Sequence, residues 1–121
     1  MFSRPSLAPY PEITVPQMLR QSAARWPDKI TVIHGTQVMT FGELDERVDR
    51  FASAMAALAI KPGEVVALFL PNSVEFIIAY YGALRAGAAV SPLNPTYKAR
   101  EVAYQAGDTG AAVLVTVRDL Y

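Results

Sequence analysis

The stretch that decides the fold runs from Lys61 to Pro95 and reads KPGEVVALFLPNSVEFIIAYYGALRAGAAVSPLNP. Its first apolar run, Val65 to Leu70, is nearly continuous, which is typical of a strand covered on both faces. Ser73 can then cap a helix over Val74 to Ala86, whose apolar residues leave almost no polar face. Ala88 to Ser91 reads as a second short buried strand. This order predicts a strand–helix–strand unit of a parallel sheet.

The same alternation continues towards the C-terminus. Gly87 can end the apolar helix in the left-handed conformation. Thr96 is expected to cap a further helix that stops at Gly107, and Ala111 to Thr116 reads as a third buried strand. Repeated units of this kind give a parallel sheet with right-handed crossovers.

A hairpin and an amphipathic helix precede the sheet. Lys29 to His34 and Gln37 to Thr40 are strand-like runs joined by a glycine-containing turn. Glu43 follows Thr40 at capping-box spacing, and apolar residues then recur with a period near 3.6 as far as Leu58. The predicted fold class is therefore α/β: a partial parallel sheet with right-handed βαβ crossovers, an N-terminal hairpin and flanking helices.

The N-terminal end divides into an arm and a short helix. Residues 1–13 contain three prolines that disfavour helix, and we expect an extended arm there. Thr14 can cap a helix that carries Met18, Leu19 and Ala23 inward. No internal repeat or second domain follows, so the rest of the chain reads as one partial subdomain over 14–121.

Composition excludes several classes of function. The chain has 121 residues, is 52% hydrophobic and has a formal net charge of zero, which gives no electrostatic footprint for nucleic acid or anionic lipid. It has no cysteine, so disulfides, thiolate metal sites and a cysteine nucleophile are absent. No apolar run is long enough for a membrane span or a signal peptide. The expected location is the cytoplasm.

Motifs for chemistry are scarce. Parallel sheets usually work at the carboxyl ends of their strands, which here are Leu70 to Ser73, Ser91 to Thr96 and the segment after Thr116. Ser73 could present a capped helix N-terminus to an anion, but a plain N-cap is the favoured reading. None of these loops is glycine-rich, and the sequence has no G-x-x-x-x-G-K-[ST], G-x-G-x-x-G or G-x-S-x-G.

Single residues also favour structural roles. His34 is the only histidine, and the sequence indicates no partner residue with which it could act as a catalytic base. Asp45, Glu46 and Asp49 form a charge run that is expected to be a solvated helix face. Four tyrosines are expected to be core or interface residues: Tyr80, Tyr81, Tyr97 and Tyr104. We therefore assign no catalytic, cofactor-binding or metal-ligating residue.

Seven short phrases, taken together, resemble the N-terminal region of the adenylate-forming enzymes. They are Thr40 to Leu44, Gly63 to Val66, Leu70 to Asn72, Arg85 to Ala88, Asn94 to Tyr97, Glu101-Val102 and Asp108 to Ala111. Their order and spacing over roughly residues 13–121 look most like an AMP-forming acyl-CoA synthetase of the medium- to long-chain fatty acid kind. Aryl-CoA ligases, luciferases and peptide-synthetase adenylation domains share most of the same region.

The resemblance implies a two-step reaction in a longer parent enzyme. ATP with Mg²⁺ would activate a carboxylate as an acyl-adenylate, and coenzyme A would then displace AMP. The family's phosphate loop, ribose-binding acid and catalytic lysine match nothing here and would lie beyond Tyr121. The chain is therefore expected to be an N-terminal fragment that is inactive alone and binds no cofactor itself. Its expected partners are the remainder of the parent and, through an exposed apolar helix at Val74 to Ala86 or the sheet beside it, a second copy.

Two other readings compete with this one. The chain could be a stand-alone interaction or oligomerisation module that keeps the ligase-like fold without catalysis. It could also be an unrelated flavodoxin-like receiver, but a receiver needs clustered acids at its strand ends, and here Pro71 and Asn72 follow the first buried strand.

Overall fold

A computed structural model describes residues 13–117. The described elements, in chain order, are α1 (Val15–Arg25), β1 (Ile30–His34), β2 (Gln37–Thr40), α2 (Phe41–Ala57), β3 (Val65–Phe69), α3 (Val74–Arg85), β4 (Ala89–Pro92), α4 (Ala99–Thr109) and β5 (Val113–Thr116). The extended arm predicted over 1–13 lies outside the described residues except for Ile13. None of the described helices is long and apolar enough to cross a membrane.

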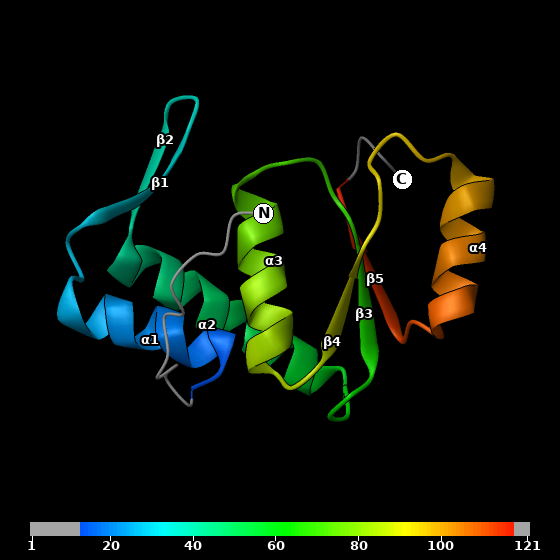
Figure 1. Ribbon diagram of the computed structural model, residues 1–121, viewed down its shortest axis with the longest axis horizontal. Helices are drawn as coiled ribbons and strands as arrows, with labels where there is room; N and C mark the ends of the chain where they lie inside the picture. The colour runs from blue at the N-terminus through cyan, green and yellow to red at the C-terminus, as the bar shows by residue number, and fades with distance from the viewer. Residues whose placement is uncertain (1–12, 118–121) are drawn as a thin grey trace, which may run out of the picture.

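The predicted parallel sheet is confirmed, with β3 at its centre. The strand order is β4-β3-β5, and Val66 of β3 pairs with Val90 on one side and Val113 on the other. Helix α3 covers one face and α4 the other (Figure 1). Leu68 packs among the apolar side chains on the α3 side, and Ala67 faces the α4 side; both are fully buried. Burial on both faces explains the nearly continuous apolar run of β3.

Helices α2 and α3 pack closely because a glycine lies at their contact. A Cβ built on Gly82 would be 2.6 Å from Cδ1 of Phe51, which is closer than real Cβ atoms approach a neighbour. Gly82 therefore sets the distance between the two helices.

The capping box of Thr40 and Glu43 begins α2 as predicted, and the Ser73 hydroxyl caps α3.

The predicted hairpin is confirmed and projects from the helices (Figure 1). Val32 and Met39 are buried on the face towards α1 and α2, whereas Ile33 and Val38 are exposed on the other. Helix α1 begins with the predicted Thr14 cap. The inward position predicted for Met18 is wrong: it is 49% exposed, because Leu19 and Ala23, one turn apart, form the buried stripe of this helix.

Both predicted ends of the last helix are wrong. Lys98, and not Thr96, is the N-cap of α4, and its amide donates to the Glu101 carboxylate. Thr96 lies in the preceding loop, where the Asn94 side chain accepts hydrogen bonds from its amide and hydroxyl. The helix passes Gly107 and ends at Thr109, and its C-cap is Gly110, whose φ of 64° is the left-handed conformation. Gly87, in contrast, has the predicted left-handed φ, at 89°.

The exposed patch predicted on α3 does not form there. Its large apolar side chains are buried or half-buried, because α2 covers one side of the helix and the sheet covers the other. Among the described residues, most of the exposed large apolar side chains lie on α1 and the hairpin. In the sheet, Leu114 of β5 is 43% exposed.

Candidate functional site

The first loop at the carboxyl edge of the sheet connects β3 to α3. The Ser73 hydroxyl accepts a hydrogen bond from the Phe76 amide at 3.2 Å and donates one to the Pro71 carbonyl at 2.9 Å. Its oxygen is thereby used within the loop. Ser73 is thus the N-cap of α3, as the sequence predicts.

The second loop connects β4 to α4 and is held in the same way. The Asn94 carboxamide oxygen accepts from the Thr96 amide at 2.9 Å and from the Thr96 hydroxyl at 2.7 Å. The Leu93 amide donates to the Leu68 carbonyl at 2.8 Å, which continues the β3–β4 pairing beyond the strand. The polar groups of this loop thus shape the backbone.

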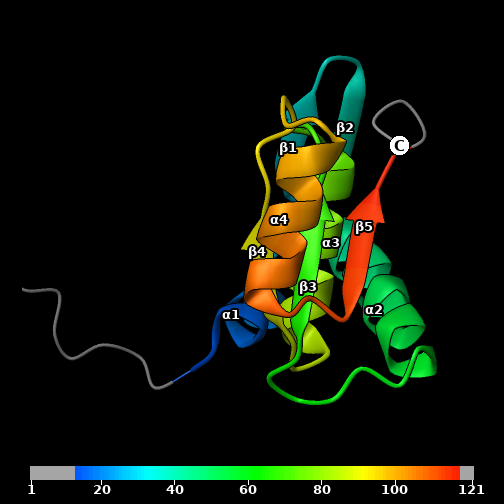
Figure 2. The ribbon, with the colours of Figure 1, turned by 90° about the vertical axis from the view of Figure 1, so that its right-hand side faces the viewer.

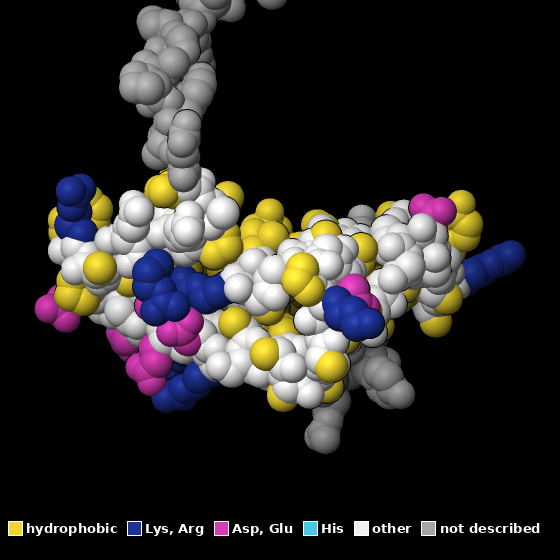
Figure 3. Space-filling model, turned by 90° about the horizontal axis from the view of Figure 1, so that it is seen from below, with side chains coloured by type: hydrophobic (Ala, Val, Ile, Leu, Met, Phe, Trp, Pro, Cys, Tyr) yellow, Lys and Arg dark blue, Asp and Glu magenta, His cyan; other side chains and the backbone are white. Residues whose placement is uncertain are grey.

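The main concentration of charge in the described residues joins three helices. Arg85 of α3 is only 12% exposed and contacts Asp45 at 2.8 Å and Asp49 at 3.0 Å, both on α2. Arg20 of α1 contacts the same two acids, at 3.3 and 2.6 Å. Figure 3 shows basic side chains directly beside acidic ones at this end of the molecule. We call Arg20, Asp45, Asp49 and Arg85 the four-charge cluster.

The four-charge cluster corrects the prediction of a solvated acidic face at Asp45, whereas the Asp49 side chain is 45% exposed. Asp45 is only 16% exposed, and the paired guanidinium groups neutralise both aspartates. Glu46 does remain on the surface, in an ion pair with Arg50 at i,i+4 spacing. No local pattern in the sequence indicates the Arg85 contacts, because its partners lie 36 and 40 residues away in the chain.

The cluster shifts the titration of two of its members. Partial burial raises the pKa of Asp49, but the hydrogen bonds and positive charges of Arg20 and Arg85 outweigh it and hold that pKa below its usual value. The hydrogen bond to Asp49 and the two carboxylate charges raise the pKa of Arg20. Both shifts favour the charged forms, which is the behaviour of a structural ion-pair network.

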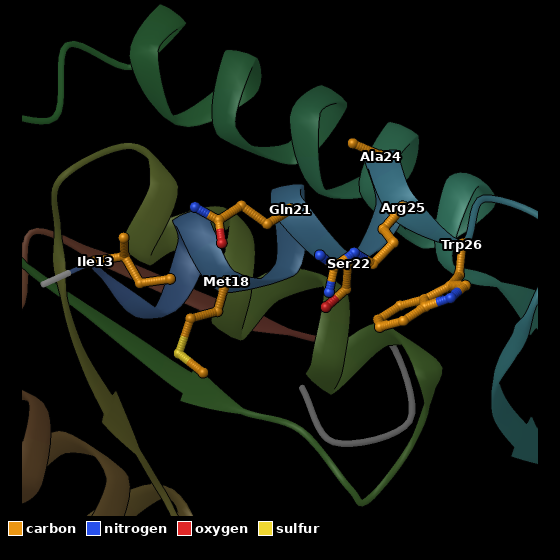
Figure 4. Close-up of a pocket in the computed structure, with 7 residues that line it drawn as sticks. All are labelled: Ile13, Met18, Gln21, Ser22, Ala24, Arg25 and Trp26. Atoms are coloured by element: carbon orange, nitrogen blue, oxygen red, sulfur yellow. The ribbon is translucent and has the colours of Figure 1, made fainter. Parts of the chain in front are cut away.

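The described residues form several open surface hollows, and the lining of one of them includes Arg100, Glu101 and Gln105 of α4. Figure 4 shows one along α1, where Met18, Gln21 and Ser22 line an open depression beside Trp26. The Trp26 ring is flanked by the Arg25 guanidinium at 5.2 Å and the Lys29 ammonium at 5.5 Å. No pair of side chains here has the geometry of a nucleophile and its base.

The remaining candidates are also accounted for by structure. His34 is exposed at the end of β1. Tyr80, Tyr81 and Tyr97 are half-buried as expected, but Tyr104 is 72% exposed, so it is not a core residue. Within residues 13–117, no group of three or more His, Cys, Asp or Glu side chains could hold a metal ion.

Solved structures with the same arrangement of helices and strands define the class of this fold. The N-terminal domain of FACL13 from Mycobacterium tuberculosis has a TM-score of 0.79 at 35% identity over 84% of this chain, which is 26% of that chain. The N-terminal subdomain of NpsA from Klebsiella oxytoca has the same fold, with a TM-score of 0.80 at 24% identity over 84% of this chain and 27% of that one. The fold is that of the N-terminal domains of adenylate-forming enzymes.

Sequence comparison carries the assignment further. The family model described as AMP-binding enzyme matches residues 19–120, so the chain belongs to this family. A long-chain-fatty-acid–CoA ligase from Escherichia coli O6:H1 is 41% identical over 83% of this chain, and a dimodular nonribosomal peptide synthase from Bacillus subtilis is 36% identical over 88%. The chain spans only 18% and 4%, respectively, of the lengths of these relatives.

Proposed function

We propose that this chain is the N-terminal portion of an ATP-dependent acyl-CoA ligase. The observation that carries the proposal is the 41% identity to a long-chain-fatty-acid–CoA ligase over most of the chain. The reaction proposed for the whole enzyme joins a carboxylic or fatty acid to coenzyme A, with ATP converted to AMP and pyrophosphate. ATP, Mg²⁺ and coenzyme A are thus its proposed substrates and cofactor, and a cytoplasmic location is proposed with them.

In this proposal the chain contributes structure and no catalytic group. The hydroxyl and amide oxygens of the carboxyl-edge loops are engaged within those loops, and the four-charge cluster is neutralised internally. A triphosphate needs clustered donors or cations for charge neutralisation. The described residues do not fit such a group, so we assign no step of the ATP chemistry to them and expect the chain alone to be inactive.

The proposal can be tested in two parts. The purified chain should give no fatty-acid-dependent ATP–pyrophosphate exchange and no ATP binding by calorimetry. Residues 19–117 grafted into the Escherichia coli ligase in place of the matching segment should retain formation of acyl-CoA. The same graft with Gly82→Val is the matched control and should lose activity together with stability, because valine cannot fit against Phe51. Exchange by the isolated chain, or a folded but inactive graft, would contradict the proposal.

A second candidate is a non-catalytic interaction or oligomerisation module with a ligase-like fold. The observation that favours it is the apolar side chain of Leu114 on β5, which is 43% exposed. A folded graft that forms no acyl-CoA would support this candidate over the first.

A further inference from the structure

Little apolar packing attaches helix α1 to the rest of the described chain. The buried residues of α1 are Leu19 and Ala23. Leu19 packs in the cluster that contains Val48 of α2 and Val74 of α3, whereas Ala23 has only a methyl group to bury. Segments with few buried apolar contacts are those that open locally while the rest of a protein stays folded.

The two ends of α1 are attached in different ways. After its C-terminal end, the backbone is hydrogen-bonded to the start of α2, because the Gly42 amide donates to the Pro27 carbonyl at 2.9 Å. At the first turn, the contact with α3 comes from a side chain, since the Arg85 guanidinium donates to the Pro16 carbonyl at 3.3 Å. The C-terminal end is therefore fixed through backbone groups, and the first turn is held to α3 by an arginine.

Open hollows lie between α1 and α3. Figure 2 shows α1 nearly end-on, beside the lower half of α3. One hollow is lined by Val15 in the first turn of α1 and by Leu84 near the end of α3. The other is lined by Ser22 of α1 and by Ile77 and Tyr81 of α3. Side chains on opposite sides of a hollow lack close contacts across it, so little dispersion energy is lost when the two helices separate.

The four-charge cluster supplies the attachment that these hollows do not. Arg20, in the middle of α1, contacts Asp49 of α2 at 2.6 Å. Arg85 of α3 contacts Asp49 at 3.0 Å and Asp45 at 2.8 Å, so the three helices meet through charged groups. The Arg20 and Asp49 side chains are 51% and 45% exposed, and dissolved salt can therefore screen their attraction.

We propose that the four-charge cluster is an ionic latch, and that α1 opens as a unit when salt screens the cluster. The first turn of α1 moves away from α3 about the bend at Trp26 and Pro27, while the sheet stays folded. Opening uncovers Leu19 and the apolar cluster around Val48, so ionic strength controls the exposure of this apolar surface. The proposal rests on contacts between described residues and does not depend on the proposed ligase reaction.

Hydrogen exchange of the 121-residue chain in a series of salt concentrations tests the proposal. A detached helix of 11 residues is marginal in water, so its amides exchange once α1 opens. The amides of residues 18–25 should exchange about tenfold faster in about 1 M than in about 0.01 M sodium chloride, because the screening length falls from about 30 Å to about 3 Å. The amides of β3 should not change. An α1 that ignores salt, or a β3 that changes equally, would overturn the proposal.

Two arginine variants give a matched comparison at low salt. Arg85→Met removes the cation that contacts both aspartates and Pro16, and it should speed exchange at residues 18–25 at least about tenfold. Arg50→Met removes a cation that pairs only with Glu46 on α2 and should leave the exchange of α1 unchanged. Equal effects of the two variants would contradict the latch. If Arg85→Met does not fold, the salt series of the unsubstituted chain still decides the question.

Discussion

Leu68 at the centre of the sheet and Ile33 on the hairpin are both apolar strand residues, yet Leu68 is fully buried and Ile33 is 72% exposed. The sheet has a helix on each face, so both faces of β3 are covered. The hairpin has only two strands, and one of its faces meets α1 and α2. The number of covering layers decides what an apolar residue contributes to stability.

The two regions are also held together by different forces. The sheet and α3 pack through apolar side chains and one close glycine contact. Helix α1 joins α2 and α3 through a small apolar cluster and the four-charge cluster. The α1 side should therefore respond to charge and pH, and the sheet side to side-chain volume.

The largest difference is expected from truncation of the two compared residues. Leu68→Ala should lower the free energy of unfolding by about 2–5 kcal/mol, because it leaves a cavity in a covered layer. Ile33→Ala should change it by about 0.5 kcal/mol or less. Urea unfolding followed by circular dichroism at one protein concentration measures both. Comparable losses would mean that the outer face of the hairpin is covered in solution.

The next effect concerns the contact between α2 and α3. Gly82→Ala should destabilise the chain by about 1–3 kcal/mol, because the new methyl group overlaps Phe51. Gly107→Ala is the matched control within α4: no atom lies within 4 Å of its Cβ position, and alanine should stabilise the helix by about 0.5–1 kcal/mol. If both substitutions stabilise, the helices are less tightly packed than the structure indicates.

A smaller loss of stability is expected when the four-charge cluster is altered. Arg85→Met removes a guanidinium that hydrogen-bonds both aspartates and should cost about 1–2 kcal/mol, since Arg20 still pairs with them. Arg50→Met breaks only an exposed pair with Glu46 and should cost about 0.5 kcal/mol or less. Thermal unfolding of both variants separates the two cases, and equal losses would refute a special role for Arg85.

The smallest effect is a dependence on pH. The pKa of Asp49 is lower in the folded chain than in the unfolded one, so its stabilisation is present above the unfolded pKa of about 3.9 and is lost as pH falls through the folded pKa. The gap in free energy of unfolding between the unsubstituted chain and Asp49→Asn should therefore be present at neutral pH and close in acid. A gap that widens in acid would reverse the assigned sign.

The sequence predicted the parts of the fold that depend on local pattern. The Thr14, Thr40 and Ser73 caps and the left-handed Gly87 were predicted because capping and turn chemistry involve neighbours in the chain. The start of α4 was missed because its N-cap lies two residues later than predicted, at Lys98, whose amide is bound by the Glu101 side chain and not by Thr96.

Contacts between distant segments were not predictable in the same way. Asp45 was predicted to be a solvated acid, because no residue near it in the sequence indicates its contact with Arg85. The absence of a catalytic constellation was inferred from missing motifs, and it stays a prediction.

The central position of β3 also has a consequence for the order of events during synthesis. Helix α1, the hairpin and α2 leave the ribosome as a contiguous block and can associate early, whereas Val66 must wait for Val113 before its second neighbour exists. Until then the most apolar strand of the chain has one open side, and its pairing closes a long loop. The nascent chain therefore passes through an interval in which β3 needs protection from other chains, and that interval ends only when β5 has been made.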